Sequence, residues 1–322
     1  MAPLPKLRTV IEADNRWVVL RQDGIVEEWV GENLPSNFEI PDDPIRRLPL
    51  GSRKDIVLIA ASFNHSTALT SSGSLLTWRG YQQLSQTKNE SKLIKETPSP
   101  PNIVAIASGG WSDLLLDDQG RVFYREVRTL DLNRDDTLEL NPLQSCLPLA
   151  SRISSFESEN RILAKDGSLW LYNDSILSSS DPSKPLQFNR EPGPKFIEIA
   201  QGESFVYGLT KTGDVYSKGD HNDYGQLSLS YKTPTVPSKS FTKIPSLKEI
   251  VKIACSPIGV GLALGADGRF WTWGLGLSTT PTPTSIDPKY IPLLLNNSPA
   301  QVPSSQHMER VFRYLESRPL TL

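Results

Sequence analysis

Residues 196–229 read FIEIAQGESFVYGLTKTGDVYSKGDHNDYGQLSL, the clearest copy of a pattern that fills most of the chain. Its first apolar run ends in a small-residue turn at Gly202, and its second leads into the two-residue turn Thr212-Gly213. Hairpin turns whose twist matches the flanking strands need a positive φ, which glycine adopts without steric cost. A third run at Val215 and Tyr216 precedes a polar loop, so the stretch predicts three strands joined by two turns.

The same pattern recurs six times along the chain. Successive hairpin glycines are separated by 49, 47, 47, 46 and 55 residues. A nearly fixed period of this length is typical of repeat architectures such as propellers. The six glycines are Gly24, Gly73, Gly120, Gly167, Gly213 and Gly268.

Aliphatic and aromatic residues keep fixed distances from these glycines. A β-branched residue lies fourteen positions before each of the first five, and an aromatic residue lies three or five positions after every one. Offsets of three and five have the same parity, so the rings point to one face of a strand, whereas a helix would scatter them. In the sixth copy Ile253 is one residue farther from Gly268, which we interpret as a β-bulge. The aliphatics are Val10, Ile59, Ile106, Ile153 and Ile199; the aromatics are Trp29, Trp78, Phe123, Trp170 with Tyr172, Tyr216, and Trp271 with Trp273.

We expect one all-β domain over residues 1–322, with proline-rich and charged loops between the copies. The copies span about 7–30, 56–80, 103–125, 150–173, 196–229 and 250–275. Residues 307–322 allow two interpretations. Met308, Val311 and Phe312 have the spacing of a short C-terminal helix, but the segment also aligns with the first half of the sixth copy, as a half-repeat.

Composition narrows the classes of function. The net charge of -2 shows no basic excess that would indicate binding to nucleic acid or to a membrane surface. Cys146 and Cys255 form no metal-spaced pair, so we expect two reduced thiols and neither a disulfide framework nor a zinc site. No apolar stretch has the length of a signal peptide core or of a membrane helix, which predicts a cytoplasmic or nuclear protein.

The repeat resembles that of the regulator of chromosome condensation family. In the second copy, the shared motif is carried by Ile59-Ala60, His65-Ser66, Ala68-Leu69-Thr70 and Gly73, and in the copy at 196–229 it extends to the closing Gly225-Gln226-Leu227. The resemblance implies a β-propeller of seven four-stranded blades, of which six repeats can be counted here. It covers most of residues 7–275. The family's histidine survives only as His65; the other copies carry Arg16, Ser112, Glu159, Phe205 and Val260 at its place.

The founding members of that family are nucleotide exchange factors for a small GTPase, which they engage with an apolar wedge and acidic residues. This sequence has no clear wedge insertion. The same repeat also serves ubiquitin-ligase adaptors, and a fold alone does not transfer an activity. The resemblance therefore implies a non-enzymatic interaction scaffold, without cofactor, working as a monomeric propeller within a protein complex. An exchange factor and a substrate-recognition module of a ubiquitin ligase are the alternatives.

Three groups of residues invite a catalytic or ligand-binding interpretation. Asp220, His221 and Asp223 lie in the family's polar loop, where such side chains cap turns. His65 and Ser66 are adjacent in a strand and face opposite sides, so they do not form a dyad. Gly274-Leu275-Gly276 is followed by neither a lysine nor a helix start, as a phosphate loop would be. The sequence predicts no catalytic or metal-ligating residue.

Partner binding is the remaining role. The position of His65 should place one residue per repeat in a ring, and the diversity of these residues suggests an asymmetric surface. Trp17 and Trp111 lie beside that position and are candidate anchors, since Trp and Arg dominate interface energetics. Packing between blades is the competing interpretation. The predicted partner-binding residues are Arg16, Trp17, His65, Trp111, Ser112, Glu159 and Phe205.

Overall fold

The computed structural model describes residues 7–13, 16–30, 45–46, 50, 53–79, 94–127, 141–143, 147–173, 188–220, 222–229, 238–255, 259–274 and 280–284. All regular elements in these ranges are strands, so they hold no helix that could cross a membrane. The segment 307–322, predicted as a helix or a half-repeat, lies outside them. The same holds for any seventh blade that it would complete.

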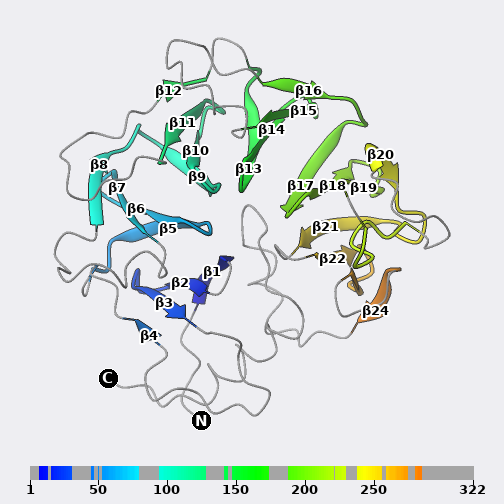
Figure 1. The fold of residues 1–322 in the computed structure, drawn as a ribbon, viewed down its shortest axis with the longest axis horizontal. Coiled ribbons are helices and arrows are strands. Elements are labelled where there is room, and N and C mark those ends of the chain that lie inside the picture. The colour runs from blue at the N-terminus through cyan, green and yellow to red at the C-terminus, as the bar shows by residue number, and fades with distance from the viewer. Residues whose placement is uncertain are drawn as a thin grey trace.

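The strands form six four-stranded antiparallel sheets, one for each sequence copy (Figure 1). The first is β1 (Leu7–Ala13), β2 (Arg16–Arg21), β3 (Val26–Val30) and β4 (Ile45–Arg46); the second is β5 (Ile56–Ala61), β6 (His65–Thr70), β7 (Ser74–Arg79) and β8 (Ile94–Pro98). The third is β9 (Ile103–Ser108), β10 (Ser112–Asp117), β11 (Val122–Glu126) and β12 (Asn141–Pro142); the fourth is β13 (Ala150–Phe156), β14 (Glu159–Ala164), β15 (Leu169–Asn173) and β16 (Asn189–Glu191). The fifth is β17 (Phe196–Gly202), β18 (Phe205–Thr210), β19 (Val215–Gly219) and β20 (Ser238–Lys243); the sixth is β21 (Ile250–Cys255), β22 (Val260–Gly265), β23 (Phe270–Gly274) and β24 (Thr282–Thr284).

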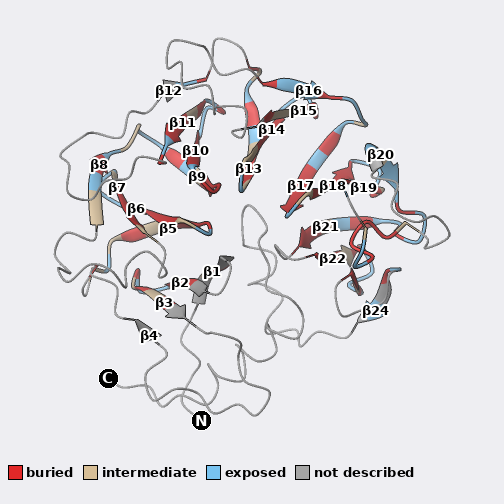
Figure 2. Ribbon diagram, viewed as in Figure 1, coloured by how far each residue is buried: buried red, intermediate tan, exposed pale blue. Residues whose placement is uncertain are grey.

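The sheets are arranged around a common centre, with the first strand of each sheet innermost (Figure 1). From the second sheet to the sixth, each innermost strand contacts that of the next sheet, for example β5 with β9 and β17 with β21. Buried residues follow the strands where sheets face one another (Figure 2). The all-β repeat architecture predicted from the sequence is thereby confirmed.

The aromatic positions lie at the contacts between sheets. Rings at offset five, such as Trp78 and Trp273, are fully buried, and those at offset three, such as Tyr216, are half-buried. In one shared cluster, Tyr207 of β18 packs with Ile253, Ala263 and Trp273 of the sixth sheet. One face of each sheet therefore covers the opposite face of its neighbour, as the parity of the pattern predicts.

The six hairpin glycines all have positive φ, between 79° and 91°. Several also approach the next repeat closely. The Gly120 carbonyl oxygen accepts a hydrogen bond of 2.8 Å from the Ala150 amide, and a Cβ on Gly120 would lie 2.7 Å from the Ala150 oxygen. Gly213 bonds to Ile250 in the same way. The hairpin end of one sheet thus holds the start of the following one.

Every first strand contains a register shift near its start, typical of a β-bulge. The bulge predicted for the extra residue of the sixth copy is wrong, because the shift there is the one common to all sheets. Ile253 pairs with Ala263 and Cys255 with Gly261 without interruption. The extra residue therefore lies between Cys255 and Val260, in the connection of the two strands.

Candidate interaction surface

The predicted ring of residues occupies one structural position. Each of the six is the first residue of the second strand in its sheet, from Arg16 in β2 to Val260 in β22. Most of the described side chains are covered, however. The exposed fractions are 2% for His65, 0% for Ser112, 1% for Phe205 and 5% for Val260.

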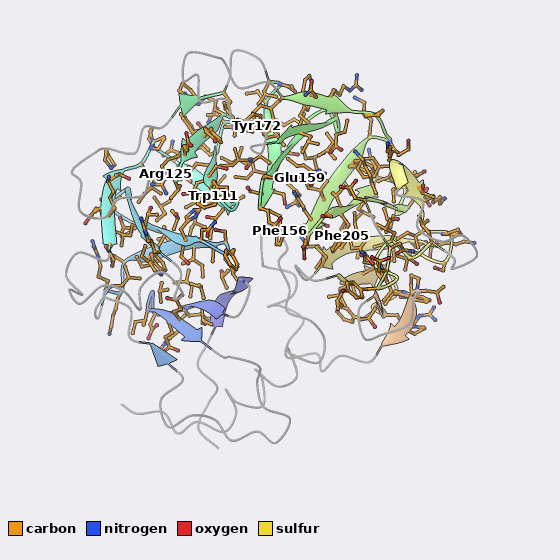
Figure 3. The ribbon with its side chains drawn as sticks, in the orientation of Figure 1. Trp111, Arg125, Phe156, Glu159, Tyr172 and Phe205 are labelled. Atoms are coloured by element: carbon orange, nitrogen blue, oxygen red, sulfur yellow. The ribbon has the colours of Figure 1, made fainter. Side chains whose placement is uncertain are left out.

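This burial fits the competing interpretation, packing between blades, for those four residues. The Glu159 side chain is 24% exposed. Arg16 and Trp17 start β2, but their side chains lie outside the described part of the structure. Trp111, in the turn between β9 and β10, is 41% exposed, the largest exposure among the predicted residues whose side chains are described. Figure 3 shows Trp111, Phe156, Glu159 and Phe205 near the inner ends of neighbouring sheets.

His65 belongs to a buried polar network between the second and third sheets. Its Nε2 atom lies 2.8 Å from Oδ1 of Asp113, which also accepts a hydrogen bond of 2.6 Å from the Ser108 hydroxyl. Oδ2 of Asp113 accepts one of 2.8 Å from Thr67 and pairs with Arg125. Burial by itself raises the pKa of Asp113, but the positive charge of Arg125 and the hydrogen bonds from His65 and Arg125 outweigh it, so the pKa lies well below its usual range.

Arg125 ties this network to outer strands of the second sheet. It is 0% exposed, and its Nη2 and Nη1 atoms donate to Thr77 at 2.9 Å and Thr97 at 3.3 Å. The Ser62 hydroxyl lies 3.2 Å from His65 Nδ1, which gives a serine–histidine–aspartate order. Ser62 is only 7% exposed, and its hydroxyl also lies 3.3 Å from the His65 carbonyl oxygen. We assign this chain of bonds to joining two sheets, because a nucleophile needs an accessible oxygen.

A second ionic cluster joins the fourth and fifth sheets. Arg161 donates to Glu159 at 2.7 Å and to Glu191 at 3.0 Å. Lys218 of β19 pairs with the other oxygen of Glu191. Burial acts against the charge of Glu191, but Arg161 and Lys218 outweigh this effect and lower its pKa. The buried Arg161 therefore holds the half-buried Glu159 side chain in place.

Exposed residues lie in the turns between the first and second strands of the second to fifth sheets. We call Phe63, Trp111, Glu157 and Glu203 the tip surface, with Glu159 at its edge. Phe63 is 54% exposed, and both glutamates are exposed. The sequence interpretation named Trp111 but missed the other three. Phe63, Glu157 and Glu203 lie ten residues before their hairpin glycines. The signal in the sequence is therefore a second variable position, two residues before the predicted ring.

Hydrogen bonds join these turns across sheets. The Asn64 side chain donates to the Gly110 carbonyl oxygen at 2.8 Å, and the Gly110 amide donates to the Glu157 carbonyl oxygen at 2.6 Å. A Cβ on Gly109 would lie 2.8 Å from that same oxygen, so a glycine is required for the approach. The turns that carry Trp111 and Glu157 are consequently held next to each other although they belong to different sheets.

The tip surface carries uncompensated negative charge. Burial, followed by the nearby charges of Glu203 and Glu159, raises the pKa of Glu157. Neither Glu157 nor Glu203 has an ion pair within the described ranges. The turns before the second strands in the second to fifth sheets contain no lysine or arginine.

The polar loop after β19 and the two cysteines were the other residues considered for a ligand or catalytic role. In the loop after β19, Asn222 accepts a hydrogen bond from the Leu227 amide at 2.7 Å and donates to the Leu229 carbonyl oxygen at 3.2 Å, as expected for a capped turn. His221 and Cys146 lie outside the described residues. Cys255 is buried, which raises the pKa of its thiol. Among the residues that the structure describes, no three His, Cys, Asp or Glu side chains gather as metal ligands.

Solved structures share this architecture. Yeast RCC1 (Prp20) bound to Kap60 superposes with a TM-score of 0.63 at 20% identity, over 87% of this chain and 75% of that one. The fold is that of the RCC1-type repeat proteins. Prp20p from Saccharomyces cerevisiae gives a TM-score of 0.64 at 20% identity, over 87% and 77% of the two chains. Human WBSCR16 gives 0.62 at 17% identity, over 87% and 82%. The resemblance predicted from the repeats is confirmed for the RCC1-type fold.

Sequence comparisons with curated proteins are weaker. The E3 ubiquitin-protein ligase HERC2 of Homo sapiens is 32% identical over 101 residues, which are 31% of this chain and 2% of HERC2. Protein pim1 of Schizosaccharomyces pombe is 22% identical over 244 residues, 68% of this chain and 37% of pim1. The chain thus spans well under two thirds of either relative. No protein-family model matches it.

Proposed function

We propose that this RCC1-type protein is a non-enzymatic interaction scaffold that docks a protein partner on the tip surface around Trp111. One observation carries the proposal: Trp111 exposes 41% of its surface in a turn that is hydrogen-bonded to the turns of exposed Phe63 and unpaired Glu157. Buried Trp side chains are frequent hot spots of protein interfaces, and a tryptophan left this exposed offers a partner such an anchor.

The backbone around Trp111 supports this role. The bonds from Asn64 to Gly110 and from Gly110 to Glu157 fix three turns relative to one another. A rigid, preorganised surface loses less conformational entropy on binding than a loose one. The buried network at Asp113 and Arg125 holds the underlying sheets in place.

The similar proteins also have protein partners. One solved structure is yeast RCC1 bound to Kap60, and another concerns the binding of Prp20p to Gsp1p and histones. HERC2 is a ubiquitin ligase, which keeps a substrate-recognition module open as an alternative for this chain. These likenesses support a protein partner of some kind, and the location in cytoplasm or nucleus stays a prediction.

The experiment is affinity purification from the source cell with mass spectrometry, comparing the wild type with Trp111→Ala. We expect Trp111→Ala to lose the captured partner while its melting temperature stays near that of the wild type. Ile197→Ala is the matched control, because Ile197 is 49% exposed and lies near the start of β17, toward the hairpin end. Equal capture by Trp111→Ala and wild type would contradict docking at the tip surface.

A separate assay distinguishes the exchange-factor alternative. Release of a fluorescent nucleotide is followed for a panel of small GTPases with and without the protein. A scaffold leaves the intrinsic release rate unchanged. Acceleration of release from any GTPase would replace the scaffold with an exchange factor.

A further inference from the structure

We propose that the tip surface recognises a basic segment of its partner, with an arginine or lysine stacked on Trp111 and paired with Glu157 and Glu203. This inference rests on the proposed docking role and adds the chemistry of the partner. It follows from exposed aromatic surface and complementary charge at the same turns.

The aromatic part of the surface comes first. Trp111 and Phe63 belong to equivalent turns of adjacent sheets, and both rings are exposed. The face of a tryptophan ring attracts a cation within about 6 Å, and the attraction is greatest for groups that carry little bound water, such as guanidinium. An arginine side chain can therefore stack its guanidinium on the Trp111 ring while its aliphatic stem packs on apolar surface.

The charges select the sign of the ligand. Glu157 and Glu203 occupy equivalent positions of the fourth and fifth repeats, and Glu159 lies beside them. Glu157 carries no ion pair among the described residues. Its negative charge is already disfavoured by burial and by the like charges of Glu203 and Glu159. A bound cation removes this repulsion, whereas an acidic peptide or a phosphate group would increase it.

The region also has an excess of hydrogen-bond acceptors. Gln201 of β17 is 3% exposed, and its amide donates to the Glu159 carbonyl oxygen at 3.1 Å. The other end of that amide, Oε1, has no donor within the described part of the chain. That atom is buried, so the acceptors open to a partner are the exposed carboxylates of Glu157 and Glu203. A guanidinium presents five N–H donors and no acceptor, which matches these carboxylates.

Binding is measured by fluorescence anisotropy with a labelled oligo-arginine peptide, at several salt concentrations. The variants are Trp111→Ala and the double variant Glu157→Gln/Glu203→Gln. The matched control is Asp118→Asn/Glu249→Gln, which removes two exposed carboxylates near the hairpin ends of the sheets. An oligo-glutamate peptide of equal length serves as the negative probe.

We expect Trp111→Ala to weaken oligo-arginine binding by about tenfold, equivalent to a cation–π contact of roughly 1.4 kcal/mol. The double variant at Glu157 and Glu203 should weaken binding by a similar factor and reduce its salt dependence. The control variant should bind within about twofold of wild type, because its charges lie at the other ends of β10 and β21. At roughly 3.3 Å per residue each strand is about 20 Å long, which exceeds the Debye length of about 8 Å at physiological salt.

Equal weakening by the control variant would overturn the inference, because it would mean attraction to net charge. Unchanged binding by Glu157→Gln/Glu203→Gln would overturn it too. The cellular partner separates the two proposals. If Trp111→Ala loses that partner and the double glutamate variant keeps it, the docking role stands and the basic ligand is wrong. If Trp111→Ala keeps it, the docking role itself falls.

Discussion

At the scale of single residues, position in the repeat determines what a side chain does more than its type does. His65 belongs to the predicted ring of partner-binding residues, yet it is buried against Asp113 of the next sheet. Glu157, two residues before the equivalent position, is exposed. Sequence parity assigns a face to each residue, but it does not tell how far the neighbouring sheet covers that face.

The buried ion pair yields a prediction about stability. Asp113→Asn leaves the charge of Arg125 without compensation at 0% exposure, so it should cost about 3 kcal/mol of unfolding free energy at neutral pH. Urea denaturation measures this. Asp118→Asn is the matched control on the same sheet, exposed, and should change stability by less than about 0.5 kcal/mol. Equal effects of the two changes would remove the network from the account of stability.

The same carboxylate gives a dependence on pH. The pKa of Asp113 is lower in the folded chain than in the unfolded chain, where it is about 4. Its contribution is therefore fully present above about pH 4 and is lost as the pH falls toward the folded value. Denaturation at decreasing pH should show a shallower loss for Asp113→Asn than for wild type, and parallel curves would contradict this.

At the scale of elements, the hairpin and its glycine were predictable because the turn imposes a backbone conformation that few residues adopt. The extra residue of the sixth copy was misplaced for a related reason. Spacing shows that a residue is added, but only the pairing of Ile253 with Ala263 shows that it follows the strand. The hydrogen bonds that join Asn64, Gly110 and Glu157 connect repeats and leave no period in the sequence.

Two glycines allow a matched test of the hairpins. Gly73 and Gly120 have φ of 86° and 91°, but only Gly120 lies against the next repeat. Gly73→Ala should cost about 1 kcal/mol for the left-handed conformation alone. Gly120→Ala should cost clearly more, because its Cβ would meet the Ala150 oxygen at 2.7 Å. Equal losses in chemical denaturation would show that the close approach is relieved without cost.

At the scale of the whole molecule, adjacent sheets share one core at each contact, and polar groups inside those contacts are specific to each pair. Between the fifth and sixth sheets, the Trp273 indole donates to the Tyr207 hydroxyl at 3.1 Å and to the Gln226 carbonyl oxygen at 3.0 Å. The aromatic period predicted this tryptophan, but its partners could not be predicted because Tyr207 lies in another repeat and Gln226 lies in a loop.

Trp273→Phe keeps the ring and removes the donor, so it tests that contact. We expect the unfolding free energy to fall by about 1 to 2 kcal/mol, because the buried Tyr207 hydroxyl and the Gln226 carbonyl oxygen each lose a donor. Fluorescence and circular dichroism should report one coincident transition, since the sheets share continuous cores. Separate transitions for the two signals would mean that the sixth sheet unfolds independently.

In the third, fourth and fifth sheets, the hairpin glycine is hydrogen-bonded to the first strand of the following repeat, so these links run in one direction along the chain. The Gly120 carbonyl gains its bond from Ala150, and that of Gly213 from Ile250, only when the following repeat has left the ribosome. During synthesis the most recent sheet therefore presents an uncovered apolar side and an open carbonyl. Any pause in translation between two repeats prolongs that exposure, and nascent chains with exposed apolar surface are the kind that chaperones protect.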